Sequence, residues 1–390
     1  MELEKRNTLI LSVAQGLSIT TTSINMINTG LVGAMLATNP SYSTIPLSLQ
    51  FLTIALTLIP VSLLMGKFGR RSMFLLGSLA AFIGCLIIAF SIIDKSFYLF
   101  ILGSIFLGFS QANQQFYRYA AADNVSNNLK SKAISLVLAG GVIAAVVGPE
   151  VSRYSFDLFP DYIYLATYLL AASIQIINFT ILIFIKIKKP EVTAKKIRPL
   201  KDILMQKTLI IAILAAAVGY SLMSFIMTAT PLQIVNICKL GNSASSTVIQ
   251  WHIIAMFAPS FFTGSIISRF GNRKVMLVGI ILYAFSVFFG ILGDTVLNFW
   301  IALFLCGLGW NFLYVGGSDI IAKSALPEER AKVQGVTDFI IFVFVAMGSF
   351  LAGYLHSNLG WEVMLFYTII PISVIFISII IIKPQNLKLN

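Results

Sequence analysis

The chain has 390 residues, of which 58% are hydrophobic and 11% are charged, and its mean hydropathy is +0.90. A soluble globular protein carries about 25% charged residues, so this composition excludes a chain that folds entirely in water. The formal net charge of +12 does not indicate a nucleic-acid partner, because the basic residues lie in short clusters between apolar runs rather than on one face of a soluble domain.

Long apolar segments follow one another along the whole chain. A hydrocarbon layer of about 30 Å is crossed by a helix of about 20 apolar residues. The predicted spans of the first half are residues 8–36, 44–65, 72–93, 97–123, 131–152 and 161–185. Those of the second half are residues 208–235, 245–267, 274–293, 297–322, 331–355 and 361–382. We therefore expect an all-α integral membrane protein with about twelve transmembrane helices in the lipid bilayer.

A lysine-rich polar stretch at residues 186–207 divides the chain. We interpret residues 1–185 and 208–390 as two pseudo-symmetric six-helix bundles and the stretch between them as a linker. The side that holds both termini and the linker carries 23 lysine and arginine residues, against 3 on the other side. By the positive-inside rule, both termini are cytoplasmic. The high isoleucine, lysine and asparagine content fits an AT-rich bacterial genome, so we expect a multi-pass protein of a bacterial inner membrane. We also expect a monomer.

Short motifs recur at a constant offset in the two halves. The sequence Phe-Gly-Arg-Arg at 68–71 returns 202 residues later as Phe-Gly-Asn-Arg at 270–273. A second correspondence, at an offset of 201, aligns the loop at 125–131 with the loop at 326–332. The shared offset indicates duplicated halves, an architecture typical of transporters, with the solute site between the halves near the middle of the membrane.

The repeated loop resembles the hallmark of the major facilitator superfamily, G-x-x-x-D-x-x-G-R-[RK]. Residues 62–71 read SLLMGKFGRR and residues 264–274 read GSIISRFGNRK. The glycines and basic residues match, whereas Gly66 and Ser268 replace the acid. Pro-Glu-Glu-Arg at 327–330 is similar to the family's loop between helices 10 and 11. The resemblance covers the whole chain and implies a secondary transporter that works by alternating access, with helices 1, 4, 7 and 10 around a central cavity.

Each of those four helices carries polar side chains at helical spacing. Polar atoms that face lipid find no hydrogen-bond partner, so we expect these side chains to point inward. The candidate substrate-binding residues are Gln15, Thr22, Asn25, Gln111, Gln114, Gln115, Tyr220, Ser224, Trp310, Asn311 and Tyr314. For the serine and threonine residues we favour hydrogen bonding between helices instead, and for the amides at 111–115 we favour a cavity.

This predicted lining is polar and aromatic but uncharged. It suits a small neutral or zwitterionic organic solute, including one with a ring that stacks on aromatic side chains. The favoured function is a secondary transporter, and the alternative is a facilitative uniporter or uptake carrier for a heteroaromatic nutrient.

A second set of residues is predicted to act in gating or ion coupling. Its members are Arg118, Asp319, Asp338, Asp123, Arg70, Arg71 and Arg273. The arginines of the two repeated loops are expected to cap the carbonyl ends of the helices that precede them. We expect Asp123 to bind Arg70 or Arg71 when the cytoplasmic side is closed.

Arg118 and Asp319 occupy equivalent positions in the two halves, at the 201-residue offset. We expect them to form a charge pair that latches the halves together when the cavity faces outward. The alternative is that each residue pairs within its own half. Proton coupling through Asp319 or Asp338 is favoured, and facilitated diffusion and counterflow remain open.

Enzymatic chemistry is not expected. The chain has two histidines, His252 and His356, and it contains neither HExxH nor GxSxG. We expect no cofactor and no metal. A channel or a transporter-like receptor is the alternative of another class, but the duplicated halves favour alternating access over a fixed pore.

Overall fold

The computed structural model describes residues 2–125, 130–187, 199–325 and 329–381, and these residues form helices and connections without a β-strand. The helices of the first half are α1 (Glu2–Leu36), α2 (Ile45–Phe68), α3 (Arg70–Ile93), α4 (Phe97–Gln114), α5 (Tyr117–Asp123), α6 (Lys130–Ser155) and α7 (Leu165–Ile183). Those of the second half are α8 (Leu200–Leu204), α9 (Lys207–Pro231), α10 (Asn242–Phe257), α11 (Ser260–Phe270), α12 (Asn272–Ile291), α13 (Val296–Ser324), α14 (Arg330–Leu359), α15 (Trp361–Tyr367) and α16 (Ile369–Ile381). A 3₁₀ turn, η1 (Pro40–Tyr42), and a π-helical segment, η3 (Leu232–Ile237), complete the fold.

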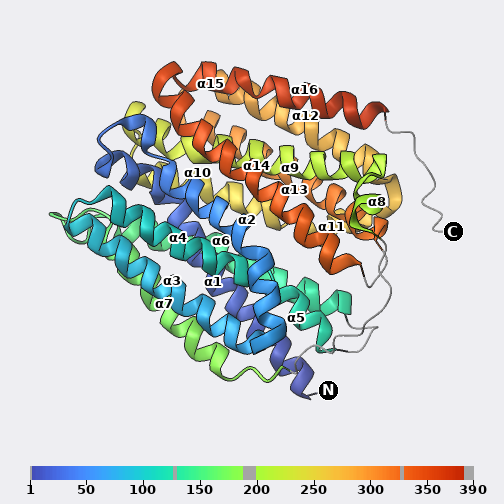
Figure 1. Cartoon of the computed structure of the whole chain (residues 1–390). Helices are drawn as coiled ribbons and strands as arrows, with labels where there is room; N and C mark the ends of the chain where they lie inside the picture. Colours follow the sequence, from blue (N-terminus) through green and yellow to red (C-terminus); the bar gives the residue numbers. More distant parts are fainter. Residues whose placement is uncertain (1, 126–129, 188–198, 326–328, 382–390) are drawn as a thin grey trace.

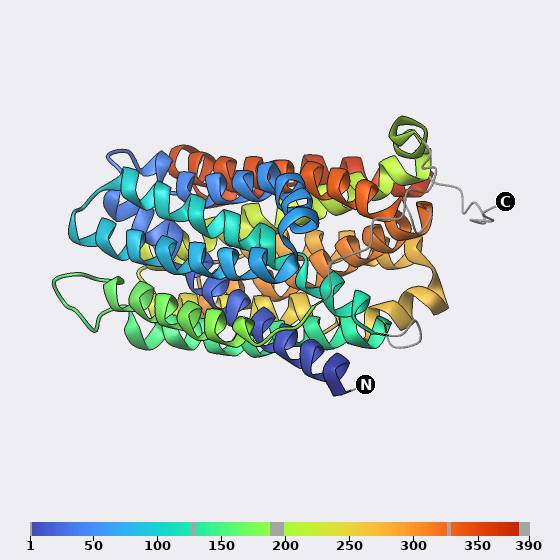
Figure 2. The same cartoon turned by 60° about the horizontal axis from the view of Figure 1, so that its bottom comes forward.

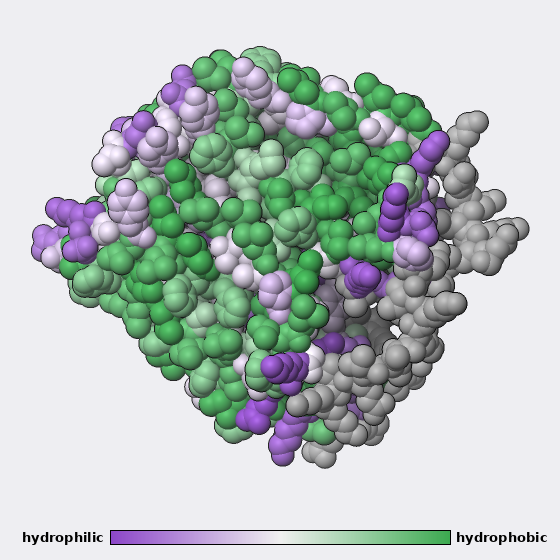
Figure 3. Space-filling model, in the orientation of Figure 1, coloured by the Kyte–Doolittle hydropathy of each residue, from purple (hydrophilic) through white to green (hydrophobic). Residues whose placement is uncertain are grey.

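Helices long and apolar enough to cross a membrane number nine in the described residues, or ten if α10 and α11 form one bent span. The protein is therefore a multi-pass helical membrane protein. Apolar residues cover most of the visible surface, and hydrophilic residues gather towards its ends (Figure 3). All twelve predicted spans coincide with helices, but the number twelve and the cytoplasmic placement of the termini stay predictions.

Three predicted spans are interrupted where continuous helices were expected, and one of them, 361–382, is interrupted at Thr368 between α15 and α16. Between α4 and α5 the chain turns at Gln115 and Phe116, and between α10 and α11 it bends by 43°. The break between α10 and α11 follows from Pro259, which lacks the amide hydrogen that a helix interior requires. The break between α4 and α5 has no proline or glycine, so the sequence carries no comparable signal for it.

The helices pack side by side in a bundle, with the first half in blue to green and the second in yellow-green to red (Figures 1 and 2). Within the first half, α1 packs against α6, and α3 packs against α4 and α7. Within the second half, α13 packs against α9, α10 and α12. The halves meet where α2 packs against α14 and where α6 packs against α10. The start of α1 and the end of α16 lie on one face, which we call the terminal face (Figure 2).

The two hallmark-like loops adopt the same geometry on the terminal face. Gly69 and Gly271 have φ angles of 85° and 83°, which glycine adopts without steric cost. Arg71 donates a hydrogen bond of 2.7 Å to the carbonyl oxygen of Ile183, and Arg273 donates one of 2.7 Å to that of Ile380. The arginines therefore cap α7 and α16.

Arg71 and Arg273 were expected to cap the preceding helices, α2 and α11. They cap α7 and α16 instead. The reason lies in the packing: α3 and α12 run antiparallel to α7 and α16 and contact them. The carbonyl ends of α7 and α16 therefore lie beside the first turns of α3 and α12, within reach of an arginine there. The correction is the same in both halves.

Arg70 makes a different contact from Arg71. Its Nη2 atom donates to the Oδ2 atom of Asp123 over 2.5 Å, which ties the start of α3 to the end of α5. The sequence predicts this pairing for the conformation in which the cytoplasmic side is closed, whereas here it is present while the cavity extends towards the terminal face; a part of Asp123 in gating stays a prediction. At the equivalent place in the second half, Asn272 donates to Asp319 over 2.8 Å.

The contact between α1 and α6 depends on two glycines and supplies a test of the packing. A Cβ atom at Gly140 would overlap the carbonyl oxygen of Ser12 and lie 3.1 Å from the amide nitrogen of Gly16. Overpacking of this kind costs about 1–3 kcal/mol. Gly140→Ala should therefore lower the melting temperature of the purified protein by several degrees, measured by thermal unfolding in detergent.

Gly264→Ala is the matched control, since a Cβ atom at Gly264 on α11 would meet nothing within 4 Å. Alanine favours a helix over glycine by about 1 kcal/mol, so the control should melt at the same temperature or higher. Equal melting temperatures for the two variants would contradict the close packing of α1 on α6.

Candidate functional site

A cavity of about 420 Å³ lies between the two halves, within the size range of small-molecule sites. Helices α1, α4, α5 and α6 line it from the first half, and α9, α10, α11 and α13 line it from the second. The lining residues are Gln15, Ile19, Thr22, Ser23, Met26, Gln111, Gln114, Gln115, Arg118, Ala139, Val142, Tyr220, Met227, Ile253, Met256, Phe257, Ser260, Phe261, Trp310, Tyr314, Val315 and Ser318.

Most of the candidate substrate-binding residues meet at this cavity. Those that line it are Gln15, Thr22, Gln111, Gln114, Gln115, Tyr220, Trp310 and Tyr314. Three others, Asn25, Ser224 and Asn311, are fully or almost fully buried and lie outside the lining. The cavity thus differs from the expected one at these three positions, and the binding role of the other residues stays a prediction.

Asn25 belongs to a chain of hydrogen bonds that fixes one wall of the cavity. The hydroxyl of Tyr168 donates to Asn25 over 3.0 Å, and Asn25 donates to Gln50 over 2.6 Å. Gln50 then donates to Gln111 over 2.8 Å, and Gln111 donates to Thr22 over 2.9 Å. The chain joins α7, α1, α2 and α4, so Asn25 acts as a link between helices while Gln111 and Thr22 form the cavity end of the chain.

Asn311 links helices in the second half. Its amide nitrogen donates to the carbonyl oxygen of Met256 and to the hydroxyl of Ser260, each over 2.7 Å, and its oxygen accepts from Thr263 over 2.6 Å. These bonds hold α13 against both sides of the α10–α11 bend. The hydroxyl of Ser224, by contrast, is buried without a described hydrogen-bond partner.

Three glutamines at the cavity have side-chain amides that make no hydrogen bond to the described residues: Gln15, Gln114 and Gln115. The Oε1 atom of Gln15 is buried as well. Gln114 and Gln115 lie at the break between α4 and α5. Each amide offers two donors and an acceptor, so this wall can bind a solute that both donates and accepts hydrogen bonds.

The opposite wall is an aromatic cluster on α9, α10 and α13. The rings of Trp310 and Tyr314 stack with centroids 4.9 Å apart, and the ring of Tyr220 meets both edge-on at 5.3 and 5.4 Å. Phe257 meets Trp310 edge-on at 5.9 Å. The indole nitrogen of Trp310 is buried without a hydrogen-bond partner among the described residues. This wall therefore combines flat aromatic surface with a hydrogen-bond donor, the indole nitrogen of Trp310, that has no partner among the described residues.

Sequence reasoning missed the contribution of α6, α10 and α11 to the lining. Ala139 and Val142 come from α6, and Ile253, Met256 and Phe261 come from α10 and α11. Because these residues are apolar, a search for polar stripes passes over them. Pro259, in the middle of a predicted span, is the one signal that marks this region.

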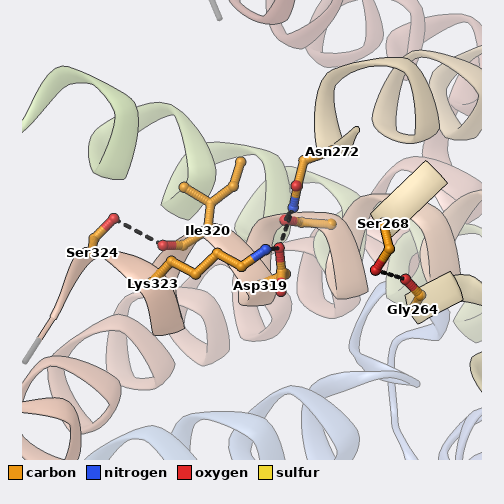
Figure 4. A network of polar contacts seen from close by, with 8 residues as sticks. Gly264, Ser268, Asn272, Asp319, Ile320, Lys323 and Ser324 are labelled. Atoms are coloured by element: carbon orange, nitrogen blue, oxygen red, sulfur yellow. Dashed lines mark hydrogen bonds and ion pairs between the residues drawn. The ribbon is translucent and has the colours of Figure 1, made fainter. Parts of the chain in front are cut away.

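The candidate gating residues Arg118, Asp319 and Asp338 lie towards the terminal face. Arg118 lines the cavity and donates to the hydroxyl of Tyr119 over 3.1 Å. Asp338, which is half-buried on α14, lies within electrostatic range of Arg118, although no ion pair within 4.0 Å joins them. Asp319 accepts from Lys323 over 2.5 Å and from Asn272 over 2.8 Å (Figure 4). In this conformation Asp319 thus pairs within its own half, as the local alternative expects.

The end of the cavity that faces away from the termini is closed by hydrogen bonds between the halves. Arg153 donates to Thr247 over 2.8 Å, and Gln250 donates to Glu150 over 3.2 Å. Near η1, Ser41 accepts from Asn358 over 3.0 Å. The lining, in contrast, continues to Arg118 on the terminal side. The cavity therefore extends towards the terminal face.

A membrane-embedded helical bundle with a polar and aromatic cavity between its halves defines a protein of the transporter class. The family model described as Major Facilitator Superfamily matches residues 11–236 and 223–388. The chain belongs to the major facilitator superfamily.

Several known proteins are similar over the whole chain. The riboflavin transporter RfnT of Brucella anthropi is 37% identical over 389 residues, which cover 98% of this chain and 97% of the relative. The structure resembles that of the nucleoside transporter NupG with a TM-score of 0.71 at 14% identity, over 96% of this chain and 99% of NupG. It also resembles the human organic anion transporter MFSD10 with a TM-score of 0.69 at 13% identity, over 96% and 99% of the two chains. The two structural likenesses show a shared fold.

The latch between Arg118 and Asp319 stays a prediction for the conformation in which the terminal face is closed. The variants Arg118→Asp and Asp319→Arg should each favour the open terminal face, because each replaces an attraction by a repulsion. A cysteine introduced at Ala139 in the cavity should then react several-fold faster with a maleimide added at that face.

Combining both substitutions restores opposite charges, so the double variant should recover part of the slow labelling. Purely additive effects in a double-mutant cycle would show that the two residues act independently. That outcome would contradict the latch. It would leave Asp319 with its local pair to Lys323 and Arg118 with its local bond to Tyr119.

Proposed function

We propose that this protein is an uptake carrier for a neutral heteroaromatic nutrient of the riboflavin type, and that it works by alternating access. The supporting observation is the pairing of an aromatic wall with a wall of unpartnered amides in one cavity of about 420 Å³. Riboflavin has an uncharged, flat ring system, which suits the aromatic wall, and a polyol chain, which suits the wall of amides. The similarity to RfnT over nearly the whole chain agrees with this substrate.

Alternating access explains the asymmetry between the two ends of the cavity. The end away from the termini is closed by bonds such as Arg153 to Thr247, and the lining extends towards the terminal face. If the basic face is cytoplasmic, as its charge predicts, this conformation is the inward-facing one, from which a nutrient is released into the cell. We assign the protein to the bacterial inner membrane, as a monomer.

Trp310 provides the direct test of the substrate class. Stacking of a flat heterocycle on an aromatic side chain contributes about 1–3 kcal/mol, and about 1.4 kcal/mol corresponds to a factor of ten. Trp310→Ala should therefore weaken riboflavin binding roughly tenfold, measured by the quenching of flavin fluorescence on titration with purified protein.

Trp300→Ala is the matched control. Trp300 lies on the same helix and stacks on Phe304 at 5.4 Å, but it does not line the cavity. It should leave the affinity for riboflavin unchanged. Absence of saturable riboflavin binding by the unmodified protein, or equal losses in the two variants, would contradict the proposed function.

We propose proton coupling through Asp338. Asp319 is held by Lys323 and Asn272, whereas Asp338 has no ion pair among the described residues and is free to bind and release a proton. Asp338→Asn keeps the shape of the side chain and removes its titratable group. It should reduce riboflavin accumulation driven by an imposed proton gradient about tenfold or more, while counterflow exchange in proteoliposomes continues.

Asp157→Asn, at an exposed carboxylate in the connection between α6 and α7, serves as the control and should retain accumulation. Full gradient-driven accumulation in Asp338→Asn would exclude Asp338 as the proton carrier. Equal uptake by the unmodified protein with and without the gradient would favour facilitated diffusion.

A further inference from the structure

The polar and aromatic side chains of the cavity are sorted between the two halves of the chain. All the amide side chains of the lining come from the first half, on α1 and α4 and in the turn that follows α4. All its aromatic side chains come from the second half, on α9, α10, α11 and α13. A duplicated fold does not require this sorting, because each half contributes its first and fourth spans to the lining.

The amides of the first half differ in whether they are free to bind a solute. Gln111 is engaged by Gln50 and Thr22, so its orientation is fixed by the protein. Gln15 and Gln114 have no such partner, although Gln114 is only 8% exposed and an atom of Gln15 is buried. The buried Oε1 atom of Gln15 has lost its hydrogen bonds to water, and the amide of Gln114 lines the cavity without a partner. The hydroxyl groups of a polyol both donate and accept, and can replace those bonds.

The aromatic wall offers the complementary chemistry. Trp310 is 5% exposed and its indole nitrogen has no acceptor among the described residues. The stacked pair of Trp310 and Tyr314, with Tyr220 edge-on to both, holds these rings in fixed orientations. A flat heterocycle with carbonyl oxygens at its edge can pack on this surface and accept from the indole.

From this sorting we infer that the two halves bind different parts of one substrate. Trp310, Tyr314 and Tyr220 bind the ring system, and Gln15, Gln114 and Gln115 bind the polyol chain. The inference rests on the proposed function, since it takes riboflavin as the solute, and it adds the orientation of that solute across the two halves.

Riboflavin and lumiflavin allow recognition of the ring system to be tested separately from recognition of the polyol chain. Lumiflavin has the same ring system as riboflavin, with a methyl group in place of the ribityl chain. The variant Gln114→Met keeps the length of the side chain and removes the amide that can form hydrogen bonds with a solute. It should weaken riboflavin binding about three- to tenfold and change lumiflavin binding by less than twofold, in fluorescence-quenching titrations of the purified protein.

Trp310→Ala should weaken both flavins by a similar factor, which makes it the matched contrast to Gln114→Met. Gln15→Met, on a different helix, repeats the test if Gln114→Met fails to fold, and melting temperatures report folding for each variant. Equal weakening of both flavins by the glutamine variants would overturn the division of the site, as would unchanged riboflavin binding in both of them.

The outcomes also distinguish this inference from the proposed function. If the unmodified protein binds neither flavin, the proposed function fails and the orientation fails with it. If it binds both flavins but the glutamine variants do not discriminate between them, riboflavin remains the substrate and only the assignment of the amide wall is wrong.

Discussion

Hydrocarbon offers no hydrogen-bond partner, so every polar group inside the membrane has to find one in the protein or in a cavity. In the first half of this chain the requirement is met by a directed series of bonds from Tyr168 through Asn25 and Gln50 to Gln111. Each amide in the series donates in one direction and accepts from the other, which fixes its orientation. The series thereby fixes one wall of the cavity, and the side-chain amides of Gln15, Gln114 and Gln115 line the cavity outside the series.

The repeated halves keep their scaffold contacts and differ in their site. Arg71 and Arg273 cap equivalent neighbouring helices with bonds of the same length, 2.7 Å. At the preceding position the halves diverge, because Arg70 binds Asp123 while Asn272 binds Asp319. Divergence is greatest at the cavity, where amides face aromatic rings. A solute that is polar at one end and aromatic at the other uses such an asymmetric site better than a symmetric solute would.

Much of the fold is predictable from the sequence because its causes are local. Apolar length gives the positions of the helices, and Gly69 and Gly271 mark turns that need positive φ angles. The caps made by Arg71 and Arg273 were assigned to the wrong helices, since local sequence does not reveal which helix end lies beside a given turn. The break after Gln114 was missed for a related reason: no proline or glycine marks it.

The candidate site was predictable in part, and the misses follow from helix geometry. Successive side chains on a helix point about 100° apart. Trp310 faces the cavity, so Asn311 points instead at α10 and α11, where three bonds hold it. A polar residue next to a cavity residue is therefore as well placed to join helices as to bind a solute, and one sequence without its packing does not separate these roles.

The contacts that close the cavity suggest how a solute drives the transport cycle. The halves are joined at the closed end by individual bonds such as Gln250 to Glu150 and Asn358 to Ser41. Hydrogen bonds of this kind contribute about 0.5–1.5 kcal/mol each in net terms, in addition to the packing of α2 on α14 and of α6 on α10. A solute shifts a conformational equilibrium only by its difference in affinity for the two conformations. A molecule bound to one half would contribute no such difference, because that half moves as a body. A molecule that stacks on Trp310 and also bonds to Gln114 joins the two halves, and its binding energy then depends on the distance between them. Under the proposed function, a substrate recognised by its ring in one half and by its polyol chain in the other would therefore pull the halves together, whereas either fragment alone would not.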